Sequence, residues 1–238
     1  MSLKLAIIGY GVMGHLVDHL GRSQGHEIVA TFNSDDASGN FDSRVTSLSG
    51  CDVAIDFSVA SAVRENIKAC IAAKIPLVEG TTGWSAEGQE VFKLVRDGQG
   101  AFVYGANFSI GVNLFYRLTE RAAELVNKFD NYEPFIEEAH HSRKRDAPSG
   151  TALKLSSILE GKVKTPISIT STRAGNIPGT HRVGFDSAAD QILLTHMARS
   201  REGFASGALL AAKWLRANYE NGQRGVYEFS AVFDDLLK

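Results

Sequence analysis

Short apolar runs alternate with amphipathic stretches along the first hundred residues. Each run ends at a glycine or a polar residue, which is typical of a buried strand. The runs predict strands at 3–8, 27–32, 52–57, 76–78 and 101–104. Residues with helical spacing predict helices that start at 12, at 58 or 61, and at 85 or 86, whereas the polar stretch 34–50 is expected to be a surface connection. Strands and helices in alternation favour a parallel sheet with right-handed crossovers.

The pattern changes after Asn107. Residues 109–128 carry one apolar stripe and predict a long helix. A short helix is predicted at 151–159, and strands are predicted at 134–139, 167–173, 181–186 and 191–197. The last three strands follow one another without helices, which favours an open and mainly antiparallel sheet. A helix at 204–217 and a strand at 226–229 are expected to pack back on the first domain.

The fold class that follows is α/β. It combines an N-terminal Rossmann-like dinucleotide-binding domain at 1–107, completed by 205–238, with a second α+β domain at 108–204 built on an open mixed sheet. Alternation in 167–170 and 182–185 covers only one face of that sheet. Because the other face would meet water, we expect a partner subunit to bury it and the protein to be a homo-oligomer.

Composition narrows the functional class. The 238 residues are 44% hydrophobic, and 25 Lys and Arg balance 27 Asp and Glu, so nothing global favours nucleic acid or an anionic membrane. Cys51 and Cys70 are too few for a disulfide framework or a zinc site, which favours a reducing cytosol and no metal. No signal peptide and no membrane span are expected.

A glycine-rich loop stands between the first strand and the first helix. Its sequence is Gly9-Tyr10-Gly11-Val12-Met13-Gly14, the G-x-G-x-x-G pattern in the strand–turn–helix context of dinucleotide binding. Gly9 permits the turn, Gly11 lets a pyrophosphate approach the backbone, and Gly14 lets the helix pack closely on the strand. The alternative is a glycine-rich turn that binds nothing.

The residue after the second strand bears on the choice of cofactor. NAD-binding domains place an acidic residue there to hold the ribose hydroxyls. Here the position falls on Asn33, with Ser34, Asp35 and Asp36 after it. Asparagine bonds a hydroxyl without repelling a 2′-phosphate, yet no arginine stands beside it in sequence, so NADH and NADPH both remain open.

Two further turns follow predicted strands. They comprise Gly80, Thr81 and Thr82, and then Gly105, Ala106, Asn107 and Phe108. In a parallel sheet all three turns lie along the carboxyl edge, where ligands bind in such folds. Ordinary turn chemistry is the alternative explanation for the two threonines.

The segment 138–152 concentrates chemistry of another kind. His140 and His141 titrate near neutral pH, and Arg143, Lys144 and Arg145 attract an anion. Ser149, Gly150 and Thr151 predict a helix start whose free N–H groups suit a carboxylate or phosphate. The segment therefore predicts a site that binds a small anion and gives it a proton.

Together these motifs resemble the 4-hydroxy-tetrahydrodipicolinate (dihydrodipicolinate) reductase family over nearly the whole chain. The resemblance is carried by the first glycine loop and by 56–58, 80–83, 107–113 and 140–152, with later matches at 173–175, 179–181 and 204–208. The block from His140 to Ala152 is highly specific to that family.

The resemblance implies reduction by NADH or NADPH with loss of the 4-hydroxyl as water. It implies His140 and Lys144 as the proton-donating pair, His141 as a substrate contact, and Ser149, Gly150 and Thr151 as the cradle for a substrate carboxylate. It also implies that Gly80–Thr82 and Gly105–Phe108 lie at the nicotinamide and its ribose, and that the protein is a homotetramer joined through the second sheet. The roles of Arg143, Arg145, Arg173, His181 and His196 stay open.

Three other functions compete. An aspartate or homoserine dehydrogenase shares the two-domain plan but has a different catalytic block from 140–151. A non-enzymatic nucleotide sensor needs the first glycine loop but not the His/Lys cluster. A metal hydrolase built on His140 and His141 is weaker still, because neighbouring residues at a strand end point apart and no His-x-x-x-His pair accompanies them.

Overall fold

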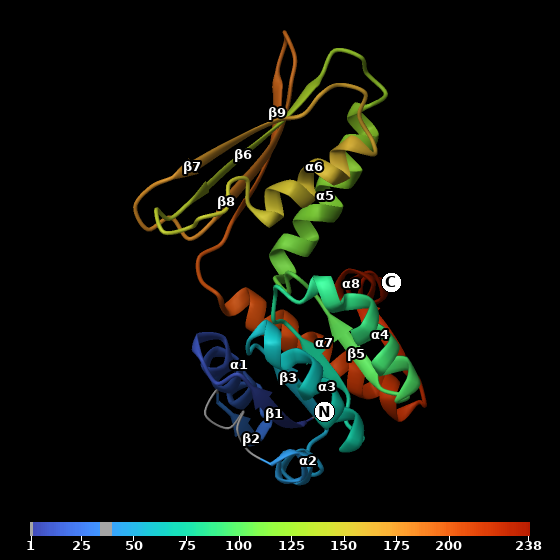
Figure 1. Cartoon of the computed structure of the whole chain (residues 1–238). Coiled ribbons are helices and arrows are strands. Elements are labelled where there is room, and N and C mark those ends of the chain that lie inside the picture. The colour runs from blue at the N-terminus through green and yellow to red at the C-terminus, as the bar shows by residue number, and fades with distance from the viewer. Residues whose placement is uncertain (1, 34–39) are drawn as a thin grey trace. The chain divides into compact units, whose positions relative to one another are not determined.

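The computed structural model describes residues 2–33 and 40–238, which form two compact units. Unit 1 contains residues up to Ser109 together with Arg201–Lys238, and unit 2 contains Ile110–Ser200. The chain therefore leaves unit 1 once and returns to it (Figure 1).

Unit 1 is built on a six-stranded sheet in the order β10-β5-β4-β3-β1-β2, and every neighbouring pair is parallel. Its strands are β1 (Lys4–Ile8), β2 (Glu27–Phe32), β3 (Val53–Asp56), β4 (Leu77–Glu79), β5 (Ala101–Tyr104) and β10 (Gly225–Glu228). β3 and β4 are buried throughout, as expected of parallel strands covered on both faces. The predicted parallel sheet is confirmed.

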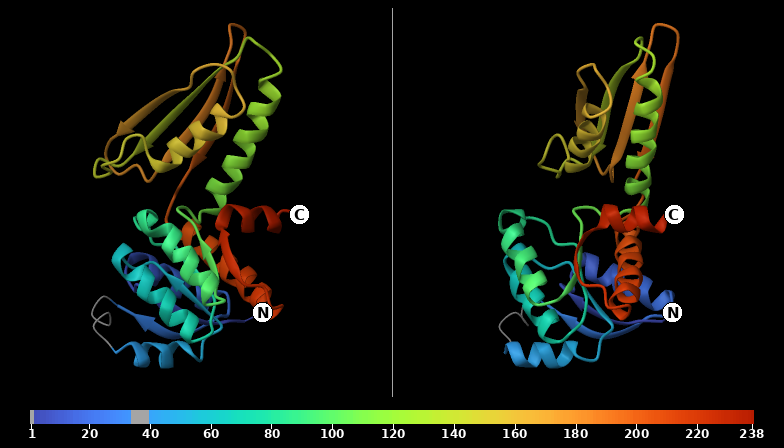
Figure 2. Two further views of the ribbon diagram at one scale, coloured as in Figure 1. Left: turned by 45° about the vertical axis from the view of Figure 1, so that its right-hand side comes forward. Right: turned by 90° about the vertical axis from the view of Figure 1, so that its right-hand side faces the viewer.

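Helices cover both faces of this sheet (Figure 2). They are α1 (Val12–Ser23), α2 (Phe41–Leu48), α3 (Val63–Ala72), α4 (Gly88–Asp97), α7 (Glu202–Glu220) and α8 (Phe229–Leu236), with 3₁₀ turns η2 (Ala60–Ala62) and η3 (Ser85–Glu87). α1 and α7 pack against each other, and α3 packs against α2 and α4. The sequence prediction missed α2, which begins where Asn40 accepts a hydrogen bond from the Asp42 N–H, and it missed α8.

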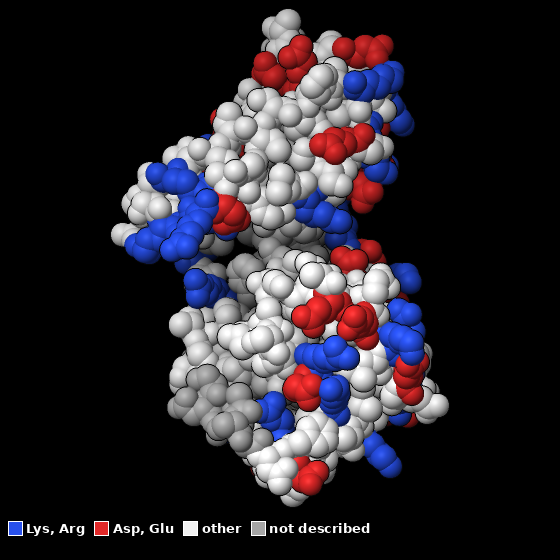
Figure 3. Space-filling model, in the orientation of Figure 1, with Lys and Arg blue, Asp and Glu red and all other residues white. Residues whose placement is uncertain are grey.

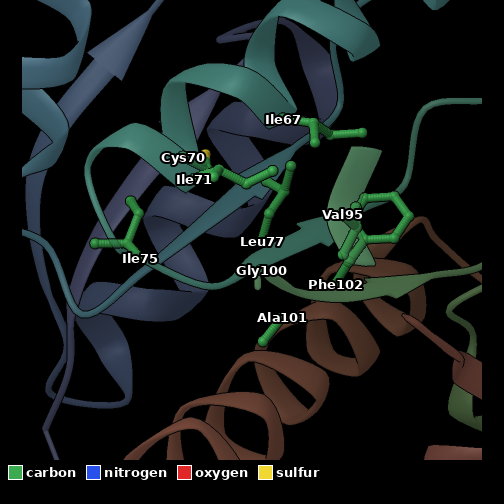
Figure 4. A pocket seen from close by; sticks show the side chains of 9 residues that line it. All are labelled: Ile67, Cys70, Ile71, Ile75, Leu77, Val95, Gly100, Ala101 and Phe102. Carbon is green, nitrogen blue, oxygen red and sulfur yellow. The ribbon is translucent and has the colours of Figure 1, made fainter. Parts of the chain in front are cut away.

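The core of unit 1 contains a small apolar void between α3, α4, β4 and β5 (Figure 4). Its lining is Ile67, Cys70, Ile71, Ile75, Leu77, Val95, Gly100, Ala101 and Phe102. Since it offers no charged or amide side chain to orient a ligand, it is a packing feature of the core. Cys51 and Cys70 are both buried and unpaired thiols.

Unit 2 is a four-stranded sheet with two helices on one face (Figure 2). Its elements are α5 (Ile110–Val126), β6 (Glu133–His140), α6 (Gly150–Glu160), β7 (Ser168–Arg173), β8 (Thr180–Asp186) and β9 (Gln191–Met197). The strand order is β7-β6-β8-β9. A cluster of buried residues that includes Ile136, Leu155 and Phe185 fills the space between sheet and helices.

The sheet of unit 2 is mixed, as the predicted fold class requires. β6–β8 and β8–β9 are antiparallel, but β7 runs parallel to β6 and pairs with no other described strand. The sheet is therefore mainly antiparallel, as predicted, and α6 provides the crossover that the parallel β6–β7 pair needs. Among the described residues, no helix combines the length and apolar character that a bilayer crossing requires.

Candidate active site

The first glycine loop has the geometry of a dinucleotide-binding turn. Gly9 has φ +82°, and a Cβ there would lie 2.5 Å from the carbonyl carbon of Phe57, so only glycine fits. A Cβ on Gly14 would lie 2.4 Å from the Gly9 carbonyl oxygen, which shows how closely α1 approaches the loop. A Cβ on Gly11 would meet no atom within 4 Å, so the backbone at the start of α1 is open to a phosphate group.

Tyr10, Val12 and Met13 complete this loop. The Tyr10 hydroxyl donates to Asp18, which also pairs with Arg22, and the Tyr10 ring lies 4.2 Å from that of His15. Val12 is 65% exposed, and Met13 is half-buried. The loop thus presents backbone and apolar surface rather than charge, as a loop that relies on N–H groups and the helix dipole requires.

The end of β2 lies beside this loop. The N–H groups of Gly9 and Tyr10 donate to the Phe32 carbonyl at 2.9 and 3.2 Å, which places Asn33 next to the glycine turn. Arg44 of α2 lies over the Phe32 ring, 6.0 Å from its centroid, and donates to Asn66 at 2.6 Å. Sequence reasoning found no arginine near Asn33, because α2 was not predicted. Ser34, Asp35 and Asp36 lie outside the described residues.

A pair of buried carboxyl groups stands beneath the Gly80-Thr81-Thr82 turn. Asp56 and Glu79 are opposite each other in the register of β3 and β4, and both are fully buried. Asp56 accepts from the Ser58 N–H and from Asn66, both at 2.7 Å, and Glu79 Oε1 accepts from the Thr81 N–H at 2.7 Å. Burial raises the pKa of both groups, that of Glu79 well above its usual range.

Glu79 also shapes the turn, through its hydrogen bond from the Thr81 N–H. Gly80 is packed under the Phe57 ring, where a Cβ would lie 2.1 Å from a ring carbon. The Thr81 carbonyl accepts from the Trp84 indole N–H at 2.8 Å, and Thr81 is nearly buried while Thr82 is exposed.

The third turn, Gly105–Phe108, follows β5 at the same carboxyl edge. The Gly105 N–H donates to the Glu79 carbonyl at 3.2 Å, which joins this turn to the preceding one. The Asn107 side chain accepts from the Ser109 N–H at 2.8 Å, and Ala106 is exposed. Phe108 is 1% exposed and packs on Phe229 with centroids 4.5 Å apart, so its side chain belongs to the core.

In unit 2 the strand register gathers the polar residues of the site. One row of residues that are paired from strand to strand crosses the sheet from β7 through β6 and β8 to β9. It consists of Ser171, Glu138, His181 and His196. Residues opposite each other share a face of the sheet. This row lies on the face that packs against α5 and α6, and His140 lies one step farther along β6 on the same face.

Within this row, Glu138 accepts hydrogen bonds from three residues. Its Oε1 accepts from the Ser149 N–H at 3.0 Å, from Ser171 Oγ at 2.7 Å and from Arg173 Nη2 at 2.7 Å, and its side chain is fully buried. Burial alone would raise the pKa of Glu138, but the hydrogen bonds from Ser149, Ser171 and Arg173 lower it to about 2. The site therefore contains a buried carboxylate that is ionised at neutral pH.

The two predicted proton donors lie around the end of β6. His140 is 8% exposed, and burial lowers its pKa, with Lys144 and Arg173 acting in the same direction and Glu138 and Asp146 opposing them. Lys144 Nζ lies 2.8 Å from Asp146 Oδ1, and its hydrogen bond and charge lower the pKa of that carboxyl. A largely neutral histidine beside a lysine can exchange protons near neutral pH.

The predicted carboxylate cradle is the N-terminus of α6. Ser149 is the N-cap, and its hydroxyl accepts from the Ala152 N–H at 3.2 Å and lies 3.1 Å from His181 Nε2. The Thr151 hydroxyl contacts that of Tyr116, while a Cβ on Gly150 would meet no atom within 4 Å. The first turn of this eleven-residue helix leaves N–H groups for an anion.

The remaining residues of the segment divide into two groups. His141 is half-buried at the end of β6, and the Lys144 N–H donates to its carbonyl at 3.1 Å. Arg143 is exposed and donates to Asn176 at 3.2 Å, and Arg145 is exposed. Lys and Arg side chains gather at this end of unit 2, where the β6–α6 loop lies (Figure 3).

Glu138, His140 and His181 have the composition of a metal site, with ligand atoms within 4.8 Å of one another. The charge of Glu138, however, is already matched by the Arg173 guanidinium. His181 is also held by Ser149, and burial, with His140 next, lowers its pKa to about 4. We therefore interpret the cluster as a buried electrostatic network and not as a metal site.

Comparison with known proteins identifies the family. Two sequence models, described as the N-terminus and the C-terminus of dihydrodipicolinate reductase, match residues 3–108 and 111–233. The chain belongs to the dihydrodipicolinate reductase family. Its relatives include a 4-hydroxy-tetrahydrodipicolinate reductase from Christiangramia forsetii. The two are 38% identical over an alignment of 248 positions, which covers 99% of this chain and 100% of the relative.

Two further proteins are also similar to this chain. The 4-hydroxy-tetrahydrodipicolinate reductase of Buchnera aphidicola is 36% identical over 72% of this chain and 70% of its own. A dipicolinate-bound dihydrodipicolinate reductase from Paenisporosarcina sp. TG-14 shares the fold, with a TM-score of 0.76 and 21% identity over 96% of this chain and 98% of that one. This membership confirms the family resemblance and favours neither an amino-acid dehydrogenase nor a nucleotide sensor.

Three residues of the site escaped sequence reasoning. Glu138 was recognised only as the start of the histidine segment. Asp56 was predicted as part of a strand and of a family motif, and Glu79 as the residue that follows the strand at 76–78, but their pairing was not predicted. The available signal was an acidic residue at an inward position of a strand, since a buried carboxylate requires partners.

Proposed function

We propose that this protein reduces 4-hydroxy-tetrahydrodipicolinate to tetrahydrodipicolinate, with NADH or NADPH as the reductant and with loss of water, in the route to diaminopimelate and lysine. The balance is substrate plus reduced cofactor plus one proton, giving product, oxidised cofactor and water. The observation that carries the proposal is the network around Glu138, which joins His140 to the N-terminus of α6.

Unit 1 has the features of the cofactor domain. The open backbone at Gly11 and the start of α1 suit the pyrophosphate, and Asn33 lies where the adenosine ribose would bind. The Gly80–Thr82 and Gly105–Asn107 turns, with the backbone of Phe108, are assigned to the nicotinamide and its ribose. The nicotinamide, when bound, supplies the hydride.

Unit 2 has the features of the substrate domain. In the cradle formed by Ser149, Gly150 and Thr151, the N–H groups of Gly150 and Thr151 hold one carboxylate of the dicarboxylate substrate, while Ser149 is the helix N-cap. His141 contacts the substrate. Hydride addition leaves electron density on the substrate, and His140 with Lys144 supplies the proton that neutralises it. The cationic side chains of the β6–α6 loop stabilise the negative charge that develops before protonation.

A homotetramer joined through the unit 2 sheet fits the exposed apolar surface. Leu193 and Met197 of β9 are 46% and 59% exposed, and by strand alternation they lie on the face opposite the helices. Light scattering at micromolar protein should give a mass four times that of the 25.7 kDa chain, and a species of monomer mass would contradict the assembly. Two buried free cysteines also suit a reducing cytoplasm.

The experiment that tests the reaction is an absorbance assay of cofactor oxidation. The enzyme is given NADH or NADPH and the condensation product of aspartate semialdehyde and pyruvate, prepared in place. Oxidation that depends on both enzyme and substrate is expected with at least one cofactor, and its absence with both would overturn the proposal.

A further inference from the structure

The carboxylate of Glu138 is placed to act on the proposed proton donor. Glu138 and His140 are two residues apart on β6, so their side chains lie on the same face of the sheet. Both are buried, with Glu138 3% and His140 8% exposed. Interactions between them are therefore shielded from water.

The two oxygens of Glu138 are in different situations. Oε1 accepts three hydrogen bonds, from Ser149, Ser171 and Arg173, and is saturated. Oε2 lies 3.4 Å from His140 Nδ1 and 3.6 Å from His181 Nε2. The Glu138 side chain is thus oriented so that Oε1 accepts all three hydrogen bonds and Oε2 faces the imidazole rings of His140 and His181.

His140 is the natural partner of that second oxygen. Within the described part of the chain, neither Glu138 Oε2 nor His140 Nδ1 has a hydrogen-bond partner, although both are buried. His181 Nε2 already has the Ser149 hydroxyl at 3.1 Å. Because an unsatisfied buried polar group costs free energy, and the two atoms are 3.4 Å apart, a small rotation of the ring would let Nδ1–H of His140 donate to Oε2 of Glu138.

We propose that Glu138 is a positioning residue that keeps a proton on Nδ1 of His140 and so makes Nε2 the atom that releases the catalytic proton. This assignment rests on the proposed function. In the step, the Nε2–H bond of the imidazolium breaks, its electron pair stays on nitrogen, and the proton goes to the electron-rich carbon of the reduced substrate. The ring is left neutral with its Nδ1–H still bonded to Glu138.

The surroundings of Nε2 agree with this role. A Cβ on Gly179 would lie 3.3 Å from His140 Nε2, so the absence of a side chain leaves space beside that nitrogen. Gly179 has φ +144°, a conformation that side chains rarely adopt, which keeps this space open.

The charges that face His140 make the effect measurable. Burial, Lys144 and Arg173 lower its pKa, and Glu138 and Asp146 raise it, while His181 lies beside it with ring centroids 5.0 Å apart. Of the two carboxylates that favour the charged ring, Glu138 acts more strongly. When the Glu138 charge is removed, the imidazolium form therefore becomes less populated at any given pH.

Glu138→Gln tests the orientation sharply. Three donors point at Oε1, so the amide oxygen of glutamine must take that place and its NH₂ must face His140. An NH₂ donates to Nδ1 and forces the neutral ring to carry its proton on Nε2. The same substitution at the adjacent Glu137, which is exposed on the other face of β6, is the matched control.

The primary readout is the histidine tautomer from ¹⁵N NMR at a pH above the His140 pKa, assigned by loss of its signals in His140→Gln. In the wild type we expect the Nδ1–H tautomer. In Glu138→Gln we expect the Nε2–H tautomer, with Glu137→Gln like the wild type. A wild-type His140 protonated on Nε2 would overturn the inference, and this result needs no variant of Glu138 to fold.

The kinetic readout separates this inference from the proposed function. For Glu138→Gln we expect kcat to fall on the order of 10-fold or more, the KM for the cofactor to stay unchanged, and the pH profile of kcat to shift to lower pH. An unchanged pH profile with a changed tautomer would leave Glu138 a positioning residue but remove His140 from proton donation. An unchanged tautomer with lost activity would overturn the positioning role itself.

Discussion

Glu138 and Ser149 join β6, the strand that carries the histidines, to α6, the helix whose N-terminus we propose as the site for the substrate carboxylate. The Ser149 N–H donates to Glu138 Oε1 at 3.0 Å, and both residues are buried. The Ser149 hydroxyl caps α6 at the same time, by accepting from the Ala152 N–H at 3.2 Å. One pair of residues thus fixes the proposed proton donor and the proposed anion site relative to each other.

Loss of the Ser149 hydroxyl should affect stability and substrate binding together. Ser149→Ala removes an N-cap, which costs about 1 kcal/mol, and releases His181 from its contact at 3.1 Å. We expect a higher KM for the substrate with a smaller change in the KM for the cofactor. Ser157→Ala, on the exposed face of the same helix, is the control. Equal effects of the two substitutions on substrate KM would argue against a cradle at this helix start.

Loss of either proton donor should reduce turnover without unfolding the protein. For His140→Gln and Lys144→Ala we expect kcat to fall on the order of 100-fold, with cofactor binding retained in fluorescence titration. The exposed residues His19 and Lys128 provide the same substitutions away from the site. Near-normal turnover in both site variants would show that the donor pair has been wrongly assigned.

The sequence predicted the fold largely because its patterns are strong. Buried strands such as 101–104 are short apolar runs bounded by turns, and β5 and β9 are found at the predicted residues. The helix α2 was not predicted within 34–50, because it is short and nearly all its residues lie at or near the surface. The final strand and helix adjoin at Glu228 and Phe229 without a turn signal between them.

Site residues that belong to a contiguous motif could be predicted from the sequence, whereas those that depend on the pairing of strands could not. The glycine loop and the segment from His140 to Thr151 are contiguous, so their chemistry can be read along the chain. Glu138 meets Arg173, Ser171 and His181 only through the register of the sheet and the parallel crossover of β7. A register of this kind is set by the whole sheet and cannot be inferred from a local pattern.

Asn33 should influence the preference between the two nicotinamide cofactors. A carboxylate at this position accepts from ribose hydroxyls but repels a 2′-phosphate. For Asn33→Glu we expect the KM for NADPH to rise about tenfold more than that for NADH, a difference of about 1.4 kcal/mol. Asn131→Glu, an exposed site in unit 2, adds the same charge elsewhere. Equal changes for both cofactors would place the ribose away from Asn33.

The Asp56–Glu79 pair should make stability depend on pH. Burial raises the pKa of Glu79 above its ordinary value of 4.5, so the folded protein keeps a proton that the unfolded chain releases. The resulting stabilisation is complete below that ordinary value and is lost as pH rises through the folded pKa. Each tenfold difference in proton affinity between the folded and unfolded states corresponds to about 1.4 kcal/mol in the free energy of unfolding.

Thermal unfolding followed by circular dichroism at pH 5 and pH 8 tests this dependence. Glu79→Gln keeps a carbonyl for the Thr81 N–H and removes the titration, so its Tm should fall less over that range than the wild-type Tm. Glu133→Gln, at an exposed position, should behave like the wild type. Parallel Tm profiles for Glu79→Gln and the wild type would contradict the raised pKa of Glu79.

The reduction itself is tested most directly by following the hydride. The enzyme is supplied with cofactor deuterated at the transferable position of the nicotinamide and with the condensation product of aspartate semialdehyde and pyruvate, and the product is analysed by mass spectrometry. We predict tetrahydrodipicolinate that carries one deuterium, formed by the wild type and far more slowly by His140→Gln. Product without deuterium, or no reduced product with either cofactor, would contradict hydride transfer by this protein.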